Sequence, residues 1–397
     1  METRAGDPGA FARFDLSRVD SPAFVVDAAK LRANLRVLAE IGERSGAKVL
    51  AALKAFSMWS VAPILGEYLD GVCTSGLWEA RLAKEFYDGE ITTYCAAYKP
   101  DDLPEILALS DHVIFNSPRQ IAMLRPIIER ARDAGETFDV GLRLNPLHPE
   151  GEVPRYDPCA PHSRLGFPID QLTVEHLGLI DGFHMHTLCE QDFEPLRRTW
   201  DKAFDHLEPY FGQFAWINLG GGHHVTRADY QRDELVEFLS DMAEDTGAQV
   251  YIEPGEAVAL DAGILVGTVL DAFENGMPVA VTDISATCHM PDVIEAPYRP
   301  ALLNELGLGE RGEGEGEPVR LGGPSCLAGD VIGDYVLPVP AEPGARFAFL
   351  DQAHYSMVKT TTFNGVPLPS IWLWDSESDA LECVKRFDWT TFRDRLS

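Results

Sequence analysis

Lys54 is the residue whose type and place first suggest chemistry. It ends an apolar run in the stretch KVLAALKAFS, residues 48–57. A lysine is expensive to bury unless its ammonium is paired or loses its charge. Either a strand ends here and the ammonium reaches water, or Lys54 is a nucleophile at the mouth of a pocket. The stretch by itself favours the first interpretation.

Three successive glycines, Gly220, Gly221 and Gly222, follow a β-type run in the segment NLGGGHHV. Glycine lets the backbone approach a ligand closely and lets several N–H groups point at one anion. The alternative is a tight turn between a strand and a helix. Because one glycine would suffice for such a turn, three glycines favour an anion site.

Two histidines, His184 and His186, stand two residues apart in the segment HMHT. On a strand both side chains would point to the same face. This would suit a metal pair, with Glu253 and His223 as further ligands. Alternatively, one imidazole offers a flat surface to a ring and the other packs in the core. The loose ligand pattern makes the metal site the less favoured alternative.

Two carboxylates, Glu253 and Glu256, flank a turn in the segment EPGE. They suit a solvated loop, or a pocket in which one lies near a ring nitrogen and the other near a ligand amine. Cys326 and Asp330 lie in a loop of small residues, GGPSCLAGD, and Tyr355 follows in AHYS. The tyrosine hydroxyl could donate to a phosphate. The structural alternatives are a buried cysteine, a turn aspartate and an amphipathic core tyrosine.

Eight short β-rich runs alternate with helical stretches of apolar spacing three and four. Because each strand returns after a helix, we expect parallel pairing and a closed (β/α)8 barrel of the α/β class. Its active site would lie at the carboxyl ends of the strands, where Lys54, the histidine pair, the glycine run and Glu253 stand. The predicted strands are residues 48–53, 71–75, 91–96, 112–116, 139–145, 182–187, 216–222 and 248–255. This convergence strengthens the interpretation of Lys54 as a nucleophile.

After about residue 260 the chain changes to β-type segments with short connections, which are typical of a mainly antiparallel domain. We predict a barrel domain over residues 30–257 and a C-terminal β domain over 258–397, joined by the N-terminal strand 20–28. Residues 309–318 are glycine and glutamate in low complexity and predict a surface loop.

The composition excludes several classes of protein. The net charge of −30 argues against nucleic acids and anionic membranes as partners, and favours a cationic ligand weakly. No apolar run approaches the ~20 residues of a membrane helix, and no secretory signal is visible. Seven scattered cysteines, none in a CxxC pair, argue against a cysteine zinc site and favour a reducing compartment. We therefore expect a cytoplasmic protein.

The ordered set of motifs resembles the alanine-racemase-like, fold-type III pyridoxal-phosphate decarboxylases. The motifs are Lys54, HxHT, LGGG, EPG, GPSC and AHYS…FNG, and the match runs from SPAFVVD to FNG. Within that family, HTLCE, YDPCAPHSRLG, EPGEAV and TCHMPDVIEAPYRP resemble the branch that acts on carboxynorspermidine or carboxyspermidine. The resemblance implies a pyridoxal 5'-phosphate enzyme that decarboxylates a cationic carboxylated polyamine to norspermidine or spermidine. It also implies a homodimer with shared active sites.

The resemblance further implies roles for single residues. Lys54 matches the lysine that forms the Schiff base with the cofactor, and His186 the histidine that stacks on its pyridine ring. The glycine run matches the phosphate loop, and Glu253 the acid that bonds the pyridine nitrogen. Cys326 matches a cysteine near the reacting carbon, contributed by the second subunit, and Tyr355 a tyrosine that holds the phosphate.

Glu256 departs from the family pattern, because many relatives read EPGR and use that arginine on the phosphate. An anion there would repel phosphate, so we predict that Glu256 faces a substrate ammonium. The resemblance places Asp292 and Glu295 where diaminopimelate decarboxylases carry an arginine for the distal carboxylate of their substrate. Acids at this place would reject such a carboxylate. We predict these acids, together with Asp330, as substrate-binding residues. The structural alternative for the first two is a solvated helix start.

Two other functions stay open from the sequence. Arg299 lies close enough to Glu295 to leave diaminopimelate, or another basic amino acid, as an alternative substrate. A metal-dependent barrel hydrolase that uses His184 and His186 is the alternative outside the family.

Overall fold

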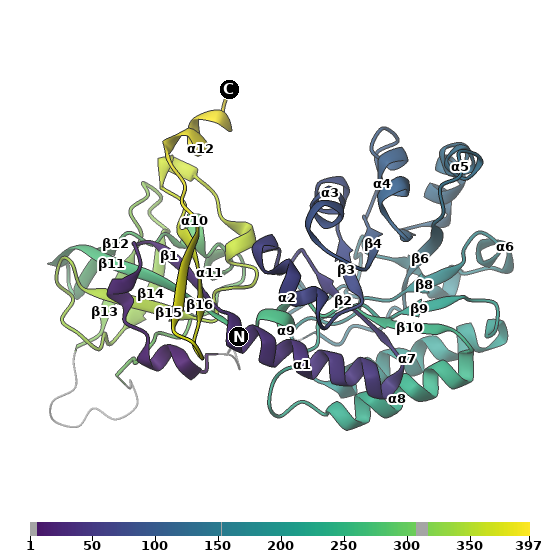
Figure 1. The fold of residues 1–397 in the computed structure, drawn as a ribbon, viewed down its shortest axis with the longest axis horizontal. Helices are drawn as coiled ribbons and strands as arrows, with labels where there is room; N and C mark the ends of the chain where they lie inside the picture. The colour runs from purple at the N-terminus through teal and green to yellow at the C-terminus, as the bar shows by residue number, and fades with distance from the viewer. Residues whose placement is uncertain (1–5, 152, 307–316) are drawn as a thin grey trace. The chain divides into compact units, whose positions relative to one another are not determined.

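The computed structural model describes residues 6–151, 153–306 and 317–397 (Figure 1). Most of the segment predicted as a surface loop, residues 309–316, lies outside the described residues. The chain divides into two compact units. One, the barrel unit, is Ala33–Val258, and the other, the sheet unit, is Met1–Arg32 together with Ala259–Ser397.

The barrel unit is a closed parallel barrel. Its strands pair in the order β5-β4-β3-β2-β10-β9-β8-β6, and β5 pairs with β6 to close the ring. Each predicted β-rich run overlaps one of these strands, so the predicted fold class is confirmed. The strands are β2 (Lys48–Ala52), β3 (Gly71–Thr74), β4 (Glu90–Tyr94), β5 (His112–Phe115), β6 (Asp139–Asn145), β8 (Gly182–His184), β9 (Trp216–Asn218) and β10 (Gln249–Ile252), and β7 (Phe167–Pro168) adds to β6.

The helices of this unit follow from their apolar spacing. In α7, Leu196, Trp200, Ala203 and Leu207 recur at intervals of three and four and are all buried, which gives one apolar face. Figure 1 shows such helices outside the ring of strands. The helices are α1 (Ala28–Ser45), α2 (Ala62–Gly66), α3 (Leu77–Phe86), α4 (Leu103–Leu109), α5 (Pro118–Asp133), α6 (Val174–Leu177), α7 (Phe193–Leu207), α8 (Arg232–Thr246) and α9 (Glu256–Ala259).

Trp216 on β9 belongs to the buried core cluster of the barrel. Its ring stacks on His112, with centroids 4.5 Å apart, and its Nε1–H donates to Asp139 over 3.1 Å. Glycines on β8, which pairs with β9, and on β6, the next strand of the ring, make room for it. A Cβ at Gly141 would lie 2.4 Å from the indole, and a Cβ at Gly182 would lie 2.2 Å from it. The closed barrel therefore depends on these small residues beside one large one.

The sheet unit is built on a mixed, mainly antiparallel sheet in which β1 is an inner strand. β1 (Ala23–Asp27) pairs antiparallel with β11 and parallel with β16, so a strand from the start of the chain lies between strands from its end. The other strands are β11 (Gly263–Glu274), β12 (Pro278–Thr282), β13 (Val319–Gly322), β14 (Val331–Tyr335), β15 (Arg346–Leu350), β16 (Ser370–Asp375) and β17 (Ala380–Lys385), and the helices are α10 (Ala286–His289), α11 (Asp292–Glu295) and α12 (Trp389–Asp394).

Alternate residues of β1 enter two different cores. Phe24 packs with Leu265 and Phe349, whereas Val25 packs with Ile264 and the tryptophans of β16. Successive side chains of a strand point to opposite faces, so both faces of this sheet are covered. None of the described helices combines the length and the apolar character needed to cross a membrane.

Gly182→Ala is expected to destabilise the barrel by about 3 kcal/mol, because the added methyl group overpacks a filled core. Urea denaturation of both proteins would measure the loss in free energy of unfolding. Gly178→Ala is the matched control, since its φ is −68° and the nearest contact of the added Cβ is 3.7 Å. Equal losses for the two variants would contradict the role assigned to the indole.

Candidate active site

Lys54 lies in the tight turn that follows β2. Neighbouring strand ends hold this turn, because Ala52 N–H donates to Pro254 O over 2.9 Å and Leu53 N–H donates to Cys73 O over 3.0 Å. Solvent reaches the Lys54 side chain. The protein around it still removes enough water to lower the pKa of Lys54 below its usual value. The amine is thus biased toward the neutral form that a nucleophile needs.

His186 lies beside this amine, with its Nε2 3.4 Å from Lys54 Nζ. β8 ends at His184, so His186 lies just after the strand and not on it, but the two rings still lie side by side as expected, with centroids 6.3 Å apart. Burial, with the charge of Lys54, holds the pKa of His186 well below its usual value. Gly221 N–H donates to His186 Nδ1 over 3.0 Å, so the proton of the neutral ring is on Nε2 and faces Lys54.

Glu253 is a buried carboxylate directly after β10. Asn218 Nδ2 donates to one of its oxygens over 2.7 Å, and His184 Nε2 lies 3.2 Å from the other. Burial alone would raise the pKa of Glu253, but His184, Asn218 and Lys54 together outweigh burial and lower the pKa. The group is therefore held as an anion inside the barrel.

All three glycines of the run after β9 are required by packing. Gly220 has φ +66° and Gly222 has φ +89°, and a Cβ at Gly221 would lie 2.1 Å from Glu253 O. The number of glycines is thus not by itself evidence for an anion site, as the sequence argument had it. The N–H groups do support one. Within the described part of the chain, no acceptor takes the N–H of Gly222 or His223.

Glu256 pairs with a histidine of the barrel unit. Its carboxylate lies 3.2 Å from His224 Nε2, and His224 itself is buried. The acid that replaces the arginine of many relatives thus has an imidazole as its neighbour. Its predicted contact with a substrate ammonium stays a prediction.

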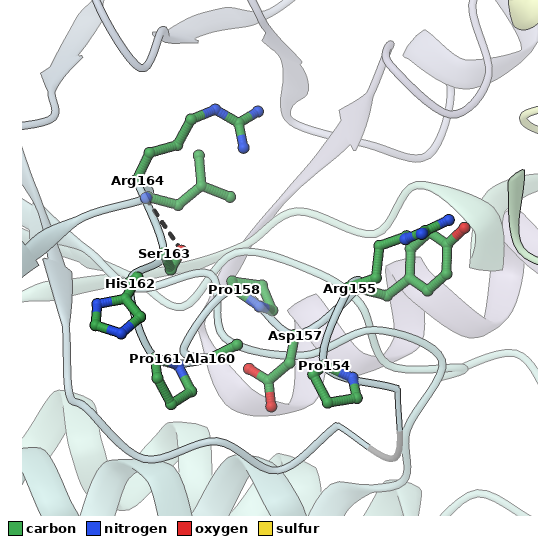
Figure 2. Close-up of a pocket in the computed structure, with 11 residues that line it drawn as sticks. Pro154, Arg155, Asp157, Pro158, Ala160, Pro161, His162, Ser163 and Arg164 are labelled. Atoms are coloured by element: carbon green, nitrogen blue, oxygen red, sulfur yellow. Dashed lines mark hydrogen bonds between the residues drawn. The ribbon is translucent and has the colours of Figure 1, made fainter.

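The segment YDPCAPHSRLG borders a cavity of about 280 Å³, lined by residues 154–158 and 160–165 (Figure 2). Asn116 ties this segment to the barrel, because its Nδ2 donates to Arg164 O over 2.9 Å while its Oδ1 accepts from Tyr94. Figure 2 shows that the side chains of Arg155, His162 and Arg164 extend in different directions. The cationic groups do not converge on one ligand.

The predicted acids of the sheet unit have partners inside that unit. Asp330 is buried, and it accepts from Ser285 Oγ over 2.8 Å. Lys359 Nζ lies 2.6 Å from Asp292 and 3.8 Å from Glu295, so an ammonium already lies beside both acids. The predicted role of all three in substrate binding stays a prediction.

The two remaining predicted residues also lie in the sheet unit. Tyr355 has a left-handed φ of +46°, and its ring centroid is 5.6 Å from Lys359 Nζ. Cys326 is exposed, and its backbone N–H donates to Asn364 Oδ1 over 2.6 Å. The predicted residues therefore form a set within the barrel unit and a second set within the sheet unit.

Comparison with known proteins decides the family. The family model described as "Pyridoxal-dependent decarboxylase, C-terminal sheet domain" matches residues 23–353. The chain is 38% identical over 385 residues to the carboxynorspermidine/carboxyspermidine decarboxylase of Campylobacter jejuni, covering 94% of this chain and 98% of that protein. The chain belongs to the pyridoxal-dependent decarboxylases. It is also 38% identical over 384 residues to carboxyaminopropylagmatine decarboxylase of Synechocystis sp., covering 96% of each.

Solved structures agree with this membership. Carboxynorspermidine decarboxylase from Campylobacter jejuni, complexed with norspermidine, gives a TM-score of 0.86 at 37% identity and covers 95% of this chain and 100% of that chain. Diaminopimelate decarboxylase from Helicobacter pylori, complexed with L-lysine, gives a TM-score of 0.79 at 16% identity, which shows a shared fold. The predicted family and its cofactor, pyridoxal phosphate, are thereby confirmed.

The barrel groups of this decarboxylase fit pyridoxal phosphate. An amine of lowered pKa suits the aldehyde, and a buried anion suits a protonated ring nitrogen. A neutral imidazole suits the flat ring, and consecutive free N–H groups suit the phosphate. The ligand atoms of His184, His186 and Glu253 also lie within 4.8 Å of one another, as a metal would need. Family membership leaves the metal-dependent hydrolase without support.

Arg143, at the end of β6, is a part of the decarboxylase site that the sequence argument missed. It is buried, donates to His186 O over 2.7 Å, and has its guanidinium carbon 4.6 Å from the Tyr94 ring centroid. Its charge helps to lower the pKa of Lys54. A charged residue in the apolar run DVGLRLN is the same signal that singled out Lys54, and it would have found Arg143.

Two thiols also lie among these groups and were missed. Cys73, on β3, is beside Glu253 and Lys54, and burial raises its pKa well above the usual value. Burial likewise raises the pKa of Cys189 to about 12. Both stay protonated near neutral pH, so neither competes with Lys54 as a nucleophile.

His289 connects segments of the sheet unit and makes that unit sensitive to acid. Its Nδ1 accepts from Ser285 N–H over 3.1 Å, and its Nε2–H donates to Pro367 O over 2.9 Å. Both contacts suit a neutral ring. Burial lowers the pKa of His289 from 6.5 to about 4.

Wild-type protein is expected to lose about 2 kcal/mol more stability than His289→Gln when the pH falls from 7 to 5. In the unfolded chain the imidazole is protonated below pH 6.5. In the folded protein its pKa is lowered to about 4, so the ring stays neutral until the pH approaches 4. The contribution of His289 to the free energy of unfolding is therefore present above pH 6.5 and is lost as the pH falls from 6.5 to about 4. Urea denaturation at both pH values measures the difference. His206→Gln, an exposed site on α7, should match wild type, and identical pH dependence in all three proteins would contradict the assignment.

Proposed function

We propose that this decarboxylase acts on a carboxylated polyamine of the carboxynorspermidine and carboxyspermidine class, to form norspermidine or spermidine. The observation that carries the proposal is the 38% identity over nearly the whole length to a decarboxylase named for these substrates. A relative at 32% identity over 96% of this chain, from Herminiimonas arsenicoxydans, carries the same name. The known structure with norspermidine bound supports the same class of ligand.

The charges of the chain suit a polycation. Glu256 follows the Glu253 turn, and Asp292 and Glu295 lie together on α11. Lys359 Nζ lies beside both α11 acids, a geometry that suits an ammonium. The overall charge of −30 favours the approach of a cationic substrate. We therefore assign these three acids to the amines of the substrate.

The barrel residues would hold the cofactor. Glu253, kept anionic, would retain the proton on the pyridine nitrogen, and His186 would lie against the ring. The N–H groups of Gly222 and His223 would bind the phosphate. When bound, pyridoxal phosphate accepts the electron pair that the departing carbon dioxide leaves on the substrate's α-carbon.

Two groups would move protons. Lys54 would hold the cofactor through its amine and, once displaced by the substrate amine, would be disfavoured as an ammonium because burial lowers its pKa. Cys326 is our proposed proton donor to the α-carbon, and Tyr355 our proposed further phosphate ligand. Both assignments rest on the family resemblance. The resemblance also supports a homodimer with shared sites, and the seven free cysteines support a cytoplasmic location.

A second candidate substrate is carboxyaminopropylagmatine. The relative named for it is 38% identical to this chain, the same value as the carboxynorspermidine/carboxyspermidine decarboxylase of Campylobacter jejuni. The agmatine end of this substrate carries a planar guanidinium instead of an ammonium, and planar groups favour bidentate carboxylate contacts. Diaminopimelate has weaker support, since the relatives named for it reach 25% identity over 62% of this chain or 23% over 78%.

Carbon dioxide release should be fastest with carboxynorspermidine or carboxyspermidine in a panel that also holds carboxyaminopropylagmatine, diaminopimelate, ornithine and lysine. The purified enzyme should show a visible absorption band that borohydride removes. Peptide mass spectrometry should place the reduced adduct on Lys54, and Lys54→Ala should lack it. Faster turnover of diaminopimelate would contradict the substrate class. A band that persists in Lys54→Ala would contradict the assignment of the lysine.

Glu256→Gln is expected to raise the KM for the polyamine about tenfold while cofactor content stays unchanged, because a neutral amide loses the charge-assisted contact to an ammonium. Steady-state kinetics and the absorption band report the two quantities. Glu244→Gln, on the exposed face of α8, is the control. An unchanged KM would remove Glu256 from the substrate site.

A further inference from the structure

The loop that carries Cys326 is a hairpin between β13 and β14. Its base is closed by Gly323 N–H, which donates to Asp330 O over 2.8 Å. Across the described residues, tip residues 325–328 make one hydrogen bond to a segment outside the hairpin, from Cys326 N–H to Asn364 Oδ1 over 2.6 Å. Exposed hairpin tips are mobile unless they are tied down. The position of Cys326 therefore depends on this one acceptor.

Asn364 is suited to this task by its backbone. It has φ +61° and ψ +13°, a left-handed conformation that asparagine tolerates better than most residues. Gly365 follows with φ +74° and donates its N–H to Thr362 O over 3.1 Å. The Asn364 side chain thus projects from a closed turn instead of a loose loop.

That turn is fixed to the base of the same hairpin through α10. On one side, Thr361 N–H donates to Cys288 O over 2.8 Å. On the other, Ser285 Oγ, just before α10, donates to Asp330 Oδ2 over 2.8 Å. The contacts form a ring from the base of the hairpin, through α10 and the Asn364 turn, back to the hairpin tip. Within this ring the buried Asp330 holds the base while Asn364 holds the tip.

We infer that Asn364 is a positioning residue, which holds Cys326 where its thiol delivers a proton. The inference rests on the role proposed above for Cys326. In that step the S–H bond breaks as a C–H bond forms, with the electron pair that carbon dioxide leaves on the α-carbon. The thiolate then regains a proton from water, which balances the proton that decarboxylation consumes. Asp330 is by the same contacts a second residue that shapes this loop.

Asn364→Gly removes the acceptor but keeps a residue at ease with positive φ. It is expected to lower kcat about tenfold or more and to change KM about twofold or less, because misplacement of a reacting group costs rate, not ground-state binding. Asn364→Asp keeps the acceptor and should retain most of the activity. Asn304→Gly is the matched control, since Asn304 has a similar φ of +57° and is exposed.

Alkylation by iodoacetamide, followed by peptide mass spectrometry, supplies a readout that needs no substrate. The rate at Cys326 should change about threefold or more in Asn364→Gly and little in Asn364→Asp, because the tether to the tip is lost only in the first. Cys383, on β17 in the same unit, is the internal reference and should be unaffected.

Unchanged kcat and unchanged alkylation of Cys326 in Asn364→Gly would overturn the inference. Equal losses in Asn304→Gly would overturn it as well, since they would mean general destabilisation. If no variant turns over the polyamines but alkylation at Cys326 still responds to Asn364, the substrate proposal fails and the positioning role stands. If Asn364→Gly does not fold, Asn364→Asp still tests the role, because it keeps the acceptor. A loss of activity in Asn364→Asp, with melting temperature and Cys326 alkylation rate unchanged, would count against the positioning role.

Discussion

A buried carboxylate, Glu253, is the constraint on which the active site depends. An anion inside a protein costs several kcal/mol unless hydrogen bonds and opposite charges offset the loss of water. Here Asn218 from β9, His184 from β8 and Lys54 after β2 provide that compensation. These residues stand at the ends of four neighbouring strands, β2, β10, β9 and β8, so they meet only when these strands pair. Pairing of these strands therefore also assembles the buried anion with its partners.

The same neighbourhood lowers the pKa of two nitrogen bases, Lys54 and His186. Desolvation and the nearby Arg143 disfavour positive charge on Lys54 and on His186. The Gly221 N–H selects the tautomer of His186, because it donates to Nδ1 and leaves the proton on Nε2. The site thus holds a buried anion, Glu253, and a buried cation, Arg143, beside two nitrogen bases whose pKa values are lowered. Such fixed charges need no rearrangement during reaction.

The sheet unit applies a similar principle to a loop. Asp330 is buried and binds Ser285 and the backbone of Thr287 and Ser325, so it shapes the hairpin that presents Cys326. Asp330 was predicted to bind substrate, but its contacts within the sheet unit are sufficient to explain why a carboxylate is buried there. On α11, Asp292 likewise has a partner within the sheet unit, because Lys359 Nζ donates to it.

The sequence by itself determined the barrel, because period-two and helical apolar patterns report the local backbone, and it singled out Lys54, the glycine run and Glu253 by their places at strand ends. Arg143 is also a charged residue in an apolar strand, so the same reasoning could have identified it from the sequence. Only the tertiary structure decided where β8 ends, which tautomer His186 adopts, and which partners meet: His224 with Glu256, Lys359 with Asp292, and Asn364 with Cys326. The last two pairs are 67 and 38 residues apart, and local periodicity carries no information on contacts that depend on loop paths and strand register.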